Sequence, residues 1–253
     1  MGFLNFIKKS FLVILCIVLL ISFIAMNALF VISSSLEYNY IQSSVKPILK
    51  DVIFKDMDKA EFEKNFEAMK LYCQQNNTEY VLFQDNNVIT IQCSDILNGT
   101  SESIVDLQID KFIQDNYYKK YECSFIQCFK SEKPLFFVLS ESTYNYFNSK
   151  FYISILISLI LIALIFFLVE FKRNVLTLIG ILLILSSLPF AKFNLFTGLI
   201  TDTNILNILT LVFAKAYTIF LISFVLGILF LGAGIGLKIW GNKETNIKTR
   251  KNK

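Results

Sequence analysis

The residues of this chain that could take part in a reaction, judged by their type and spacing, are four of its five cysteines. Cys123 and Cys128 are separated by four residues, and two nearby thiols can exchange electrons by forming and breaking a disulfide. The active pair of a thiol oxidoreductase is typically Cys-x-x-Cys, because the tight spacing tunes the thiolate. The longer spacing here favours a structural disulfide. A membrane thiol-disulfide oxidoreductase that uses Cys123 and Cys128 is kept as an alternative.

The same four cysteines also predict covalent bracing. An even number of cysteines in a small domain outside the cytoplasm is typical of disulfides, and the fifth cysteine, Cys16, lies apart in a long apolar run. Three pairings are possible. We favour Cys73–Cys93, which would pin a predicted helix to a predicted hairpin, and Cys123–Cys128, which would close a short loop. Each bridge would stabilise such a domain by roughly 2–4 kcal/mol.

Other chemistry finds little support in the residue types. The chain has no histidine, which removes the usual general base, the usual activator of a nucleophile and the commonest zinc ligand. The sequence also contains no Gly-x-Ser-x-Gly motif, no P-loop, no Gly-x-Gly-x-x-Gly motif and no cysteines at metal-binding spacing. We therefore expect no catalytic residue, no metal site, no cofactor and a non-enzymatic protein.

The elements that would hold these cysteines are dominated by long apolar runs. Hydrophobic residues make up 55% of the chain and charged residues only 17%, against about 25% charged in a typical globular protein. About 20 apolar residues span a bilayer, and the first run is too long for a signal peptide and lacks a good cleavage site. We therefore predict four transmembrane helices, at residues 11–33, 151–169, 174–191 and 216–237.

The basic residues predict how these helices are oriented. Basic residues cluster on the cytoplasmic side of membrane proteins. They are abundant in residues 1–10, in the turn after the second helix and in the tail at 238–253, whereas residues 34–150 are acidic overall. We expect a multi-pass protein of the cell membrane with both termini cytoplasmic and residues 34–150 outside. The basic tail is interpreted as a topology signal, so no nucleic acid partner is expected.

The segment at residues 192–215 is harder to place. It is apolar but is interrupted by Asp202 and by several Asn and Thr residues. We interpret it as an interfacial, extracytoplasmic segment. A longer and tilted fourth helix that starts near Leu206 explains the pattern equally well.

Small residues in the last apolar run predict close helix contacts. Ser223 and Gly227 form one small-xxx-small step, and Gly232 and Gly236 form another. Such steps let helices approach closely in lipid, either within one chain or between the copies of a homo-oligomer. The few polar residues inside the predicted helices are not ionisable, which argues against ion-coupled transport. A small channel or transport subunit lined by Ser and Thr stays an alternative.

Residues 34–150 predict a small disulfide-bonded α+β domain inserted between the first and second transmembrane helices. A capping-box pattern at residues 58–61 opens a helix whose apolar stripe ends at Cys73. Strands are expected at residues 79–83 and 88–93, and a last strand at 135–139. A second helix begins near Thr100. Its predicted inward stripe is Val105, Ile109, Phe112 and Asn116, with Ile113 and Tyr117 beside it.

Two glycosylation sequons lie in this predicted domain. Asn76 and Asn98 each begin an Asn-x-Thr tripeptide in sequence typical of turns, where an acceptor must be exposed. They agree with a position outside the cytoplasm, and we treat both asparagines as candidate acceptors of a glycan.

The layout of one helix, an outer domain and three further helices resembles that of the permease-like subunits associated with cell division and with tripartite export. Those subunits couple to an ATPase through cytoplasmic elements, often on a sizeable loop between the second and third helices. Here that loop covers only residues 170–174, and the resemblance includes no motif. Our main hypothesis is a non-enzymatic multi-pass protein in the lipid bilayer. Its outer domain would bind a ligand, a partner protein or a neighbouring subunit of a homo-oligomer.

Overall fold

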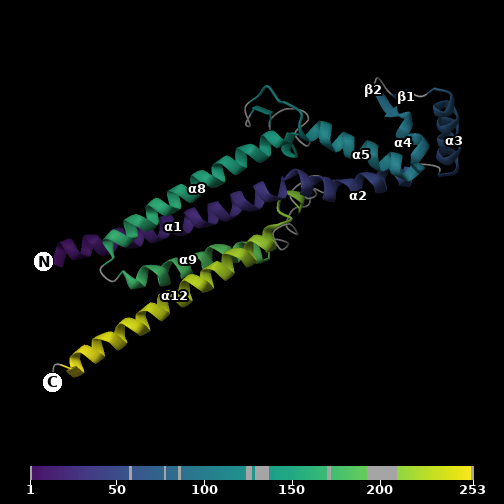
Figure 1. Ribbon diagram of the computed structural model, residues 1–253. Coiled ribbons are helices and arrows are strands. Elements are labelled where there is room, and N and C mark those ends of the chain that lie inside the picture. Colours follow the sequence, from purple (N-terminus) through teal and green to yellow (C-terminus); the bar gives the residue numbers. More distant parts are fainter. Residues whose placement is uncertain are drawn as a thin grey trace. The chain divides into compact units, whose positions relative to one another are not determined.

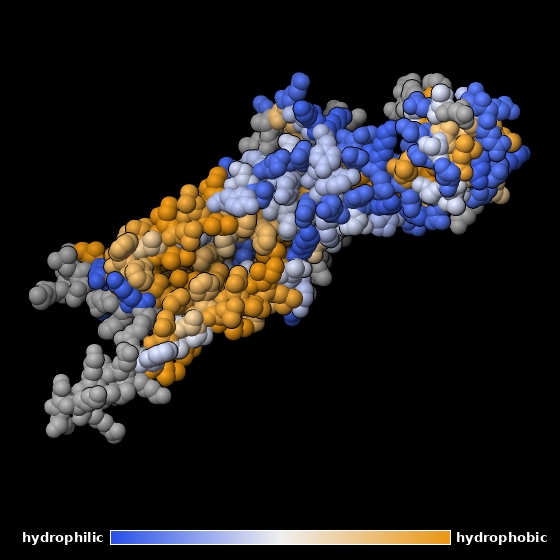
Figure 2. All heavy atoms as spheres, in the orientation of Figure 1, coloured by the Kyte–Doolittle hydropathy of each residue, from blue (hydrophilic) through white to orange (hydrophobic). Residues whose placement is uncertain are grey.

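The computed structural model describes residues 2–56, 59–76, 78–84, 87–123, 127–128, 137–169, 172–192 and 210–251. The chain divides into two compact units. One, the four-helix unit, is made of Met1–Glu37 and Ser142–Lys253, and the other, the 38–141 unit, is Tyr38–Glu141. The visible face of the four-helix unit is mostly hydrophobic, whereas that of the 38–141 unit is mostly hydrophilic (Figure 2).

The long apolar helices are α1 (Gly2–Ser35), α8 (Glu141–Leu168), α9 (Arg173–Ala191) and α12 (Ala216–Lys251) (Figure 1). Within the described residues, four segments are long and apolar enough to cross a membrane, which confirms the prediction of four such helices. They are Phe6–Ser35, Glu141–Leu168, Asn174–Ala191 and Thr210–Trp240. Both ends of the chain lie at the same end of this unit, as an even number of crossings requires (Figure 1).

The fourth candidate span begins at Thr210, and a short turn at residues 213–215 separates its first residues from α12. The backbone nitrogen of Lys215 donates to the hydroxyl of Ser35, and the Lys215 ammonium lies 3.7 Å from the Glu37 carboxylate. Residues 210–215 are therefore held at the end of α1. The rest of the predicted interfacial segment, residues 193–209, lies outside the described residues.

In the described part of the 38–141 unit, the main elements are four helices and one hairpin. The helices are α2 (Tyr38–Asp56), α3 (Lys59–Gln75), α4 (Cys93–Asn98) and α5 (Ser101–Tyr117). Strands β1 (Glu79–Gln84) and β2 (Asn87–Gln92) pair antiparallel, with Glu79 opposite Gln92. A buried core joins α3, β2, α4 and α5 through Phe66, Met69, Cys73, Ile91, Cys93, Ile96 and Ile104.

Local sequence sets where α5 begins. The Thr100 hydroxyl accepts a hydrogen bond from the Ser103 nitrogen at 3.2 Å, and the Ser103 hydroxyl accepts one from the Thr100 nitrogen at 2.8 Å. This reciprocal pair satisfies backbone donors that the first turn of a helix leaves open. Helix α5 therefore starts at Ser101, where the sequence predicted it.

The inward stripe of α5 differs from the predicted one. Val105, Ile109, Ile113 and Tyr117 are buried, whereas the Phe112 side chain is 47% exposed. The sequence has apolar residues at both 112 and 113, so two adjacent stripes fit the helical period, and packing against α2 and α3 selects the one spaced by four. The prediction that Phe112 belongs to the buried stripe is wrong.

The predicted last strand is also wrong where it can be checked. Phe137 and Val138 are helical rather than extended, and Leu135 and Phe136 lie outside the described residues. Both the backbone nitrogen and the hydroxyl of Ser140 donate to the carbonyl of Phe137, at 3.1 and 2.6 Å. These bonds close a turn just before α8. Local hydrogen bonds to the backbone outweigh the strand propensity of an aromatic run. Helix α4, which the sequence analysis missed, begins at Cys93, directly after β2.

Candidate functional site

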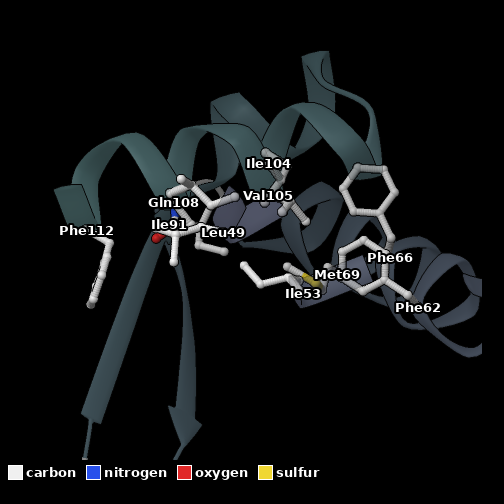
Figure 3. Close-up of a pocket in the computed structure, with 11 residues that line it drawn as sticks. Leu49, Ile53, Phe62, Phe66, Met69, Ile91, Ile104, Val105, Gln108 and Phe112 are labelled. Carbon is white, nitrogen blue, oxygen red and sulfur yellow. The ribbon is translucent and has the colours of Figure 1, made fainter. Parts of the chain in front are cut away.

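One feature of the 38–141 unit that could bind a molecule is an apolar pocket. Its volume is about 390 Å³, and α2, α3, β2 and α5 form its walls (Figure 3). Ten of its eleven lining residues are apolar and the other is Gln108. Pockets of this size and composition are typical of small-molecule sites.

The pocket has a buried floor and an open rim. Phe66, Met69 and Ile109 are buried, whereas Phe62 is half-buried and Phe112 is exposed. Phe62 and Phe112 lie at opposite ends of the pocket (Figure 3). The pocket is therefore elongated along the seam between α2 and α5, with an aromatic ring at each end.

A disulfide fixes the floor of the pocket. The sulfur atoms of Cys73 and Cys93 lie at disulfide distance, with their Cα atoms 5.1 Å apart, in the favoured pairing. Both cysteines are in the same buried core as Phe66, Met69 and Ile91, which also line the pocket. The bridge joins α3 to Cys93, which directly follows β2, so it ties together the two walls that α3 and β2 form.

Charged side chains close the seam between α2 and α5. Lys46 contacts Asp110 at 2.7 Å, and Lys50 contacts Glu102 at 2.7 Å and Asp106 at 3.0 Å. Gln42 also donates to Asp110, at 3.0 Å. We name this set the α2–α5 clasp; its residues are Gln42, Lys46 and Lys50 on α2 and Glu102, Asp106 and Asp110 on α5.

The clasp shifts the pKa values of Asp110 and Lys50. Partial burial would raise the pKa of Asp110, but hydrogen bonds from Lys46 and Gln42 outweigh burial and lower it. Hydrogen bonds to Glu102 and Asp106 raise the pKa of Lys50. Both shifts favour the charged forms of Asp110 and Lys50 at neutral pH.

The second cysteine pair lies apart from the pocket. Cys123 and Cys128 are at disulfide distance, with their Cα atoms 5.6 Å apart, and Cys128 is buried. Neither of them lines the pocket. The two pairs that the structure brings together are therefore those that the sequence analysis favoured.

The two predicted glycan acceptors are exposed in the 38–141 unit. Asn76 follows the end of α3, where its amide nitrogen lies 3.4 Å from the carbonyl oxygen of Tyr72. Asn98 is the last residue of α4. Their use as glycan acceptors stays a prediction.

The predicted packing glycines of α12 divide into two groups. A β-carbon on Gly227 would lie 3.0 Å from the carbonyl oxygen of Gly180 on α9, so this position is a close helix contact. Within the described residues, a β-carbon on Gly232 or Gly236 would meet nothing within 4 Å. The close contact toward the end of α12 is made instead by Gly234, which lies against Thr177 of α9.

Ser223, the remaining predicted packing residue, belongs to a buried polar contact that joins three helices. Its hydroxyl donates to Asn27 Oδ1 at 2.8 Å, and Asn27 Nδ2 donates to the hydroxyl of Ser186 at 3.3 Å. All three side chains are buried. We name Asn27 of α1, Ser186 of α9 and Ser223 of α12 the Asn27 clamp. Its geometry is that of interhelical hydrogen bonding in a membrane protein.

The sequence analysis missed both the pocket and the clasp. The clasp had a readable signal, because its residues recur every four positions on both α2 and α5, which places each set on one helix face. Nothing in the spacing of the apolar residues indicates that they surround a pocket rather than fill a core. Within the described residues, no three Cys, Asp or Glu side chains are grouped as a metal ion would require.

Comparison of the chain with protein-family models, with curated proteins and with solved structures finds no match. Function must therefore be argued from the geometry of the pocket and from the membrane-spanning pattern.

Proposed function

We propose that the 38–141 unit is an extracytoplasmic binding domain, anchored by the four apolar helices, and that its pocket takes the aliphatic part of a ligand. The observation that carries this proposal is the apolar pocket in a unit whose visible face is mostly hydrophilic (Figure 2). Replacing the water in an apolar pocket with a hydrocarbon lowers the free energy of the system. The ligand is therefore largely apolar.

The volume of the pocket sets the size of the ligand. A dry cavity of about 150 Å³ binds benzene, so by proportion a pocket of about 390 Å³ holds roughly 16 carbon atoms. The pocket is elongated between Phe62 and Phe112. A single aliphatic chain fits this shape better than a fused-ring molecule does.

The outer location rests on the distribution of basic residues and on the two disulfides. Basic residues flank the cytoplasmic ends of membrane helices, and disulfides persist in oxidising compartments. Lys111 in the 38–141 unit and Lys238 near the end of the candidate span Thr210–Trp240 are both exposed. A cysteine at 111 should react with a membrane-impermeant maleimide in intact cells, whereas one at 238 should react only after permeabilisation. The opposite pattern would reverse the proposed orientation.

Binding is tested with the full chain in lipid nanodiscs. The chain has four methionines; Met69 lines the pocket, and Met26 packs in the core of the four-helix unit. With ¹³C-labelled methionine methyl groups, aliphatic alcohols should shift the Met69 signal and leave the Met26 signal in place. Free alcohol is measured by equilibrium dialysis, because the alcohols also enter the nanodisc. If both signals move together, the alcohols only dissolve in the membrane and the proposal fails.

Chain length gives a quantitative test. Each CH₂ buried contributes about 0.8 kcal/mol, so affinity for the pocket should rise about fourfold per added carbon and then level off when the pocket is full. In Val105→Phe, affinity should level off at a shorter ligand chain. Val105 is buried and lines the pocket, so the larger phenylalanine ring takes up pocket volume. Leu107→Phe is the matched control, because Leu107 is exposed on the same helix. Val105→Ala, which enlarges the pocket, should have the opposite effect.

A further inference from the structure

We infer that the pocket is built for a single-chain amphiphile that carries a positive charge at the end near Phe62. This inference rests on the proposed function, since it names the chemical class of the ligand of the same pocket. The argument comes from a second hollow that adjoins the pocket and from the charges that line it.

The second hollow has a volume of about 400 Å³ and shares Phe62 with the apolar pocket. The other described residues that line it are Phe54, Glu63, Thr100, Ser101 and Glu102. Two of these are glutamates, two carry hydroxyls, and none is basic. One aromatic ring therefore stands between an apolar pocket and a polar hollow, as an amphiphile with a polar end requires.

The charges near this hollow are unbalanced. The Glu63 carboxylate accepts a hydrogen bond from the Ser101 hydroxyl, which leaves its negative charge in place. Glu102 and Asp106 share the single ammonium of Lys50. Among the described residues, Lys50 is the cation paired within this set of three carboxylates, and an ammonium group at the end of the ligand would add a second positive charge.

The same charges select against other ligands. A fatty acid would bring a fourth carboxylate to this end of the pocket, and like charges at short distance repel. An amphipathic helix is too large: one α-helical turn, a cylinder about 10 Å across and 5.4 Å long, occupies roughly 400 Å³. That single turn would already fill the pocket, whereas one aliphatic chain leaves its polar end in the second hollow.

The test compares three probes with the same twelve-carbon chain: dodecylammonium, dodecanol and dodecanoate. The full chain is placed in nanodiscs of zwitterionic lipid, the Met69 methyl signal reports binding, and free probe is measured by dialysis. Dodecylammonium should bind about 1.5-fold to fivefold more tightly than dodecanol, as expected for partly exposed charge pairs. Dodecanoate should bind most weakly.

Charge-neutral variants locate the effect. In Glu63→Gln the ratio of the affinity for dodecylammonium to the affinity for dodecanol should fall. Glu67→Gln is the matched control, because Glu67 is exposed on the same helix, pairs with Lys70 and does not line either hollow. Glu102→Gln is measured separately, because Glu102 also holds Lys50 in the clasp.

The outcomes separate this inference from the proposed function. Equal binding of all three probes, or tightest binding of dodecanoate, would overturn the inference and leave the proposed function standing. A preference for dodecylammonium that survives Glu63→Gln and Glu102→Gln together would also overturn it. Failure of every probe to shift Met69 would remove the proposed function and this inference with it.

Discussion

In the four-helix unit, buried polar side chains join helices whose outer surface is apolar, whereas the 38–141 unit joins α2 and α5 by surface charges and keeps an apolar pocket inside. Asn27 and its two serine partners are buried and carry no charge. The clasp residues Lys46 and Asp110, in contrast, are each about one-third exposed. Buried polar contacts between helices thus occur in the unit with the apolar surface, and the apolar pocket lies in the unit with the hydrophilic surface.

The solvent explains the difference. Lipid gives apolar helices no reason to associate, so close packing of small residues and interhelical hydrogen bonds must hold them together. Water drives apolar faces together without specific contacts, so in the 38–141 unit the charged contacts add little stability and chiefly fix register. The two units should therefore respond to mutation, salt and pH in different ways.

The largest effect should come from removing the disulfide under the pocket. Replacing both Cys73 and Cys93 with Ser removes a bridge across 20 residues and should cost the 38–141 unit about 3 kcal/mol. Replacing Cys123 and Cys128 removes a bridge across 5 residues and should cost about 2 kcal/mol by loop closure alone. Hydrogen exchange of α5 measures the loss. An equal rise of exchange in α9 would show that the two units are not stabilised independently.

The close helix contact of the four-helix unit gives the next effect. A β-carbon on Gly180 would lie 2.6 Å from the backbone nitrogen of Leu231 and 2.7 Å from the carbonyl oxygen of Gly227. Gly180→Ala should therefore separate α9 from α12 and cost about 1–3 kcal/mol, although alanine favours a helix. Gly232→Ala is the control and should be neutral or stabilising. Thermal unfolding in nanodiscs distinguishes the two, and equal effects would contradict the assigned helix face.

Those glycines also show how far the sequence could predict the fold. Four runs of some 20 apolar residues predict four transmembrane helices, because the length of an apolar run is enough to indicate that it can span a bilayer. A small-xxx-small step on α12, however, does not say which face meets a neighbour. Gly227 lies against α9, whereas among the described residues a β-carbon on Gly232 or Gly236 meets nothing within 4 Å, and their role in a contact between copies stays a prediction. The same ambiguity on α5 made Phe112 rather than Ile113 the predicted core residue.

The candidate site was less predictable for a related reason. The disulfide pairing beneath it followed from the order of a helix and a hairpin, and the charges of the clasp recur every four residues on both helices. The pocket itself depends on how α2, α3 and α5 diverge, and no periodicity within one helix carries that information.

The Asn27 clamp gives a smaller effect in the four-helix unit. Asn27→Leu keeps the number and branching of the side-chain heavy atoms and removes the bonds to Ser186 and Ser223. Interhelical hydrogen bonds in membranes contribute about 0.6 kcal/mol on average, so a loss of about 1 kcal/mol is expected for the pair. Ser187→Ala is the control, because its hydroxyl bonds only within its own helix, to the carbonyl of Ile184. Adding salt should leave the Asn27→Leu effect unchanged; strong salt dependence would mean that charges act at this position.

The smallest effect should come from the clasp, and it should depend on salt and pH. Asp110→Asn should cost about 0.5–1 kcal/mol at low ionic strength and less in 1 M salt. The pKa of Asp110 is lowered in the folded unit. Its stabilisation is therefore present above the ordinary aspartate pKa of about 3.9 and is lost as the pH falls through the lowered value.

The pKa of Lys50 is shifted in the opposite direction from that of Asp110, so its contribution to stability is lost at alkaline pH. Its pKa is raised, so its contribution is complete below the ordinary lysine pKa of about 10.4 and is lost as the pH rises through the raised value. Hydrogen exchange in α2 should therefore be slow and level across neutral pH, after correction for the intrinsic rate, and should accelerate at both extremes. In Asp110→Asn the acceleration of hydrogen exchange at acidic pH (the acidic branch) should weaken, whereas the acceleration at alkaline pH should persist. An unchanged acidic branch would mean that another carboxylate controls it, and the contrast with the salt-independent Asn27 clamp would then rest on Lys50 alone.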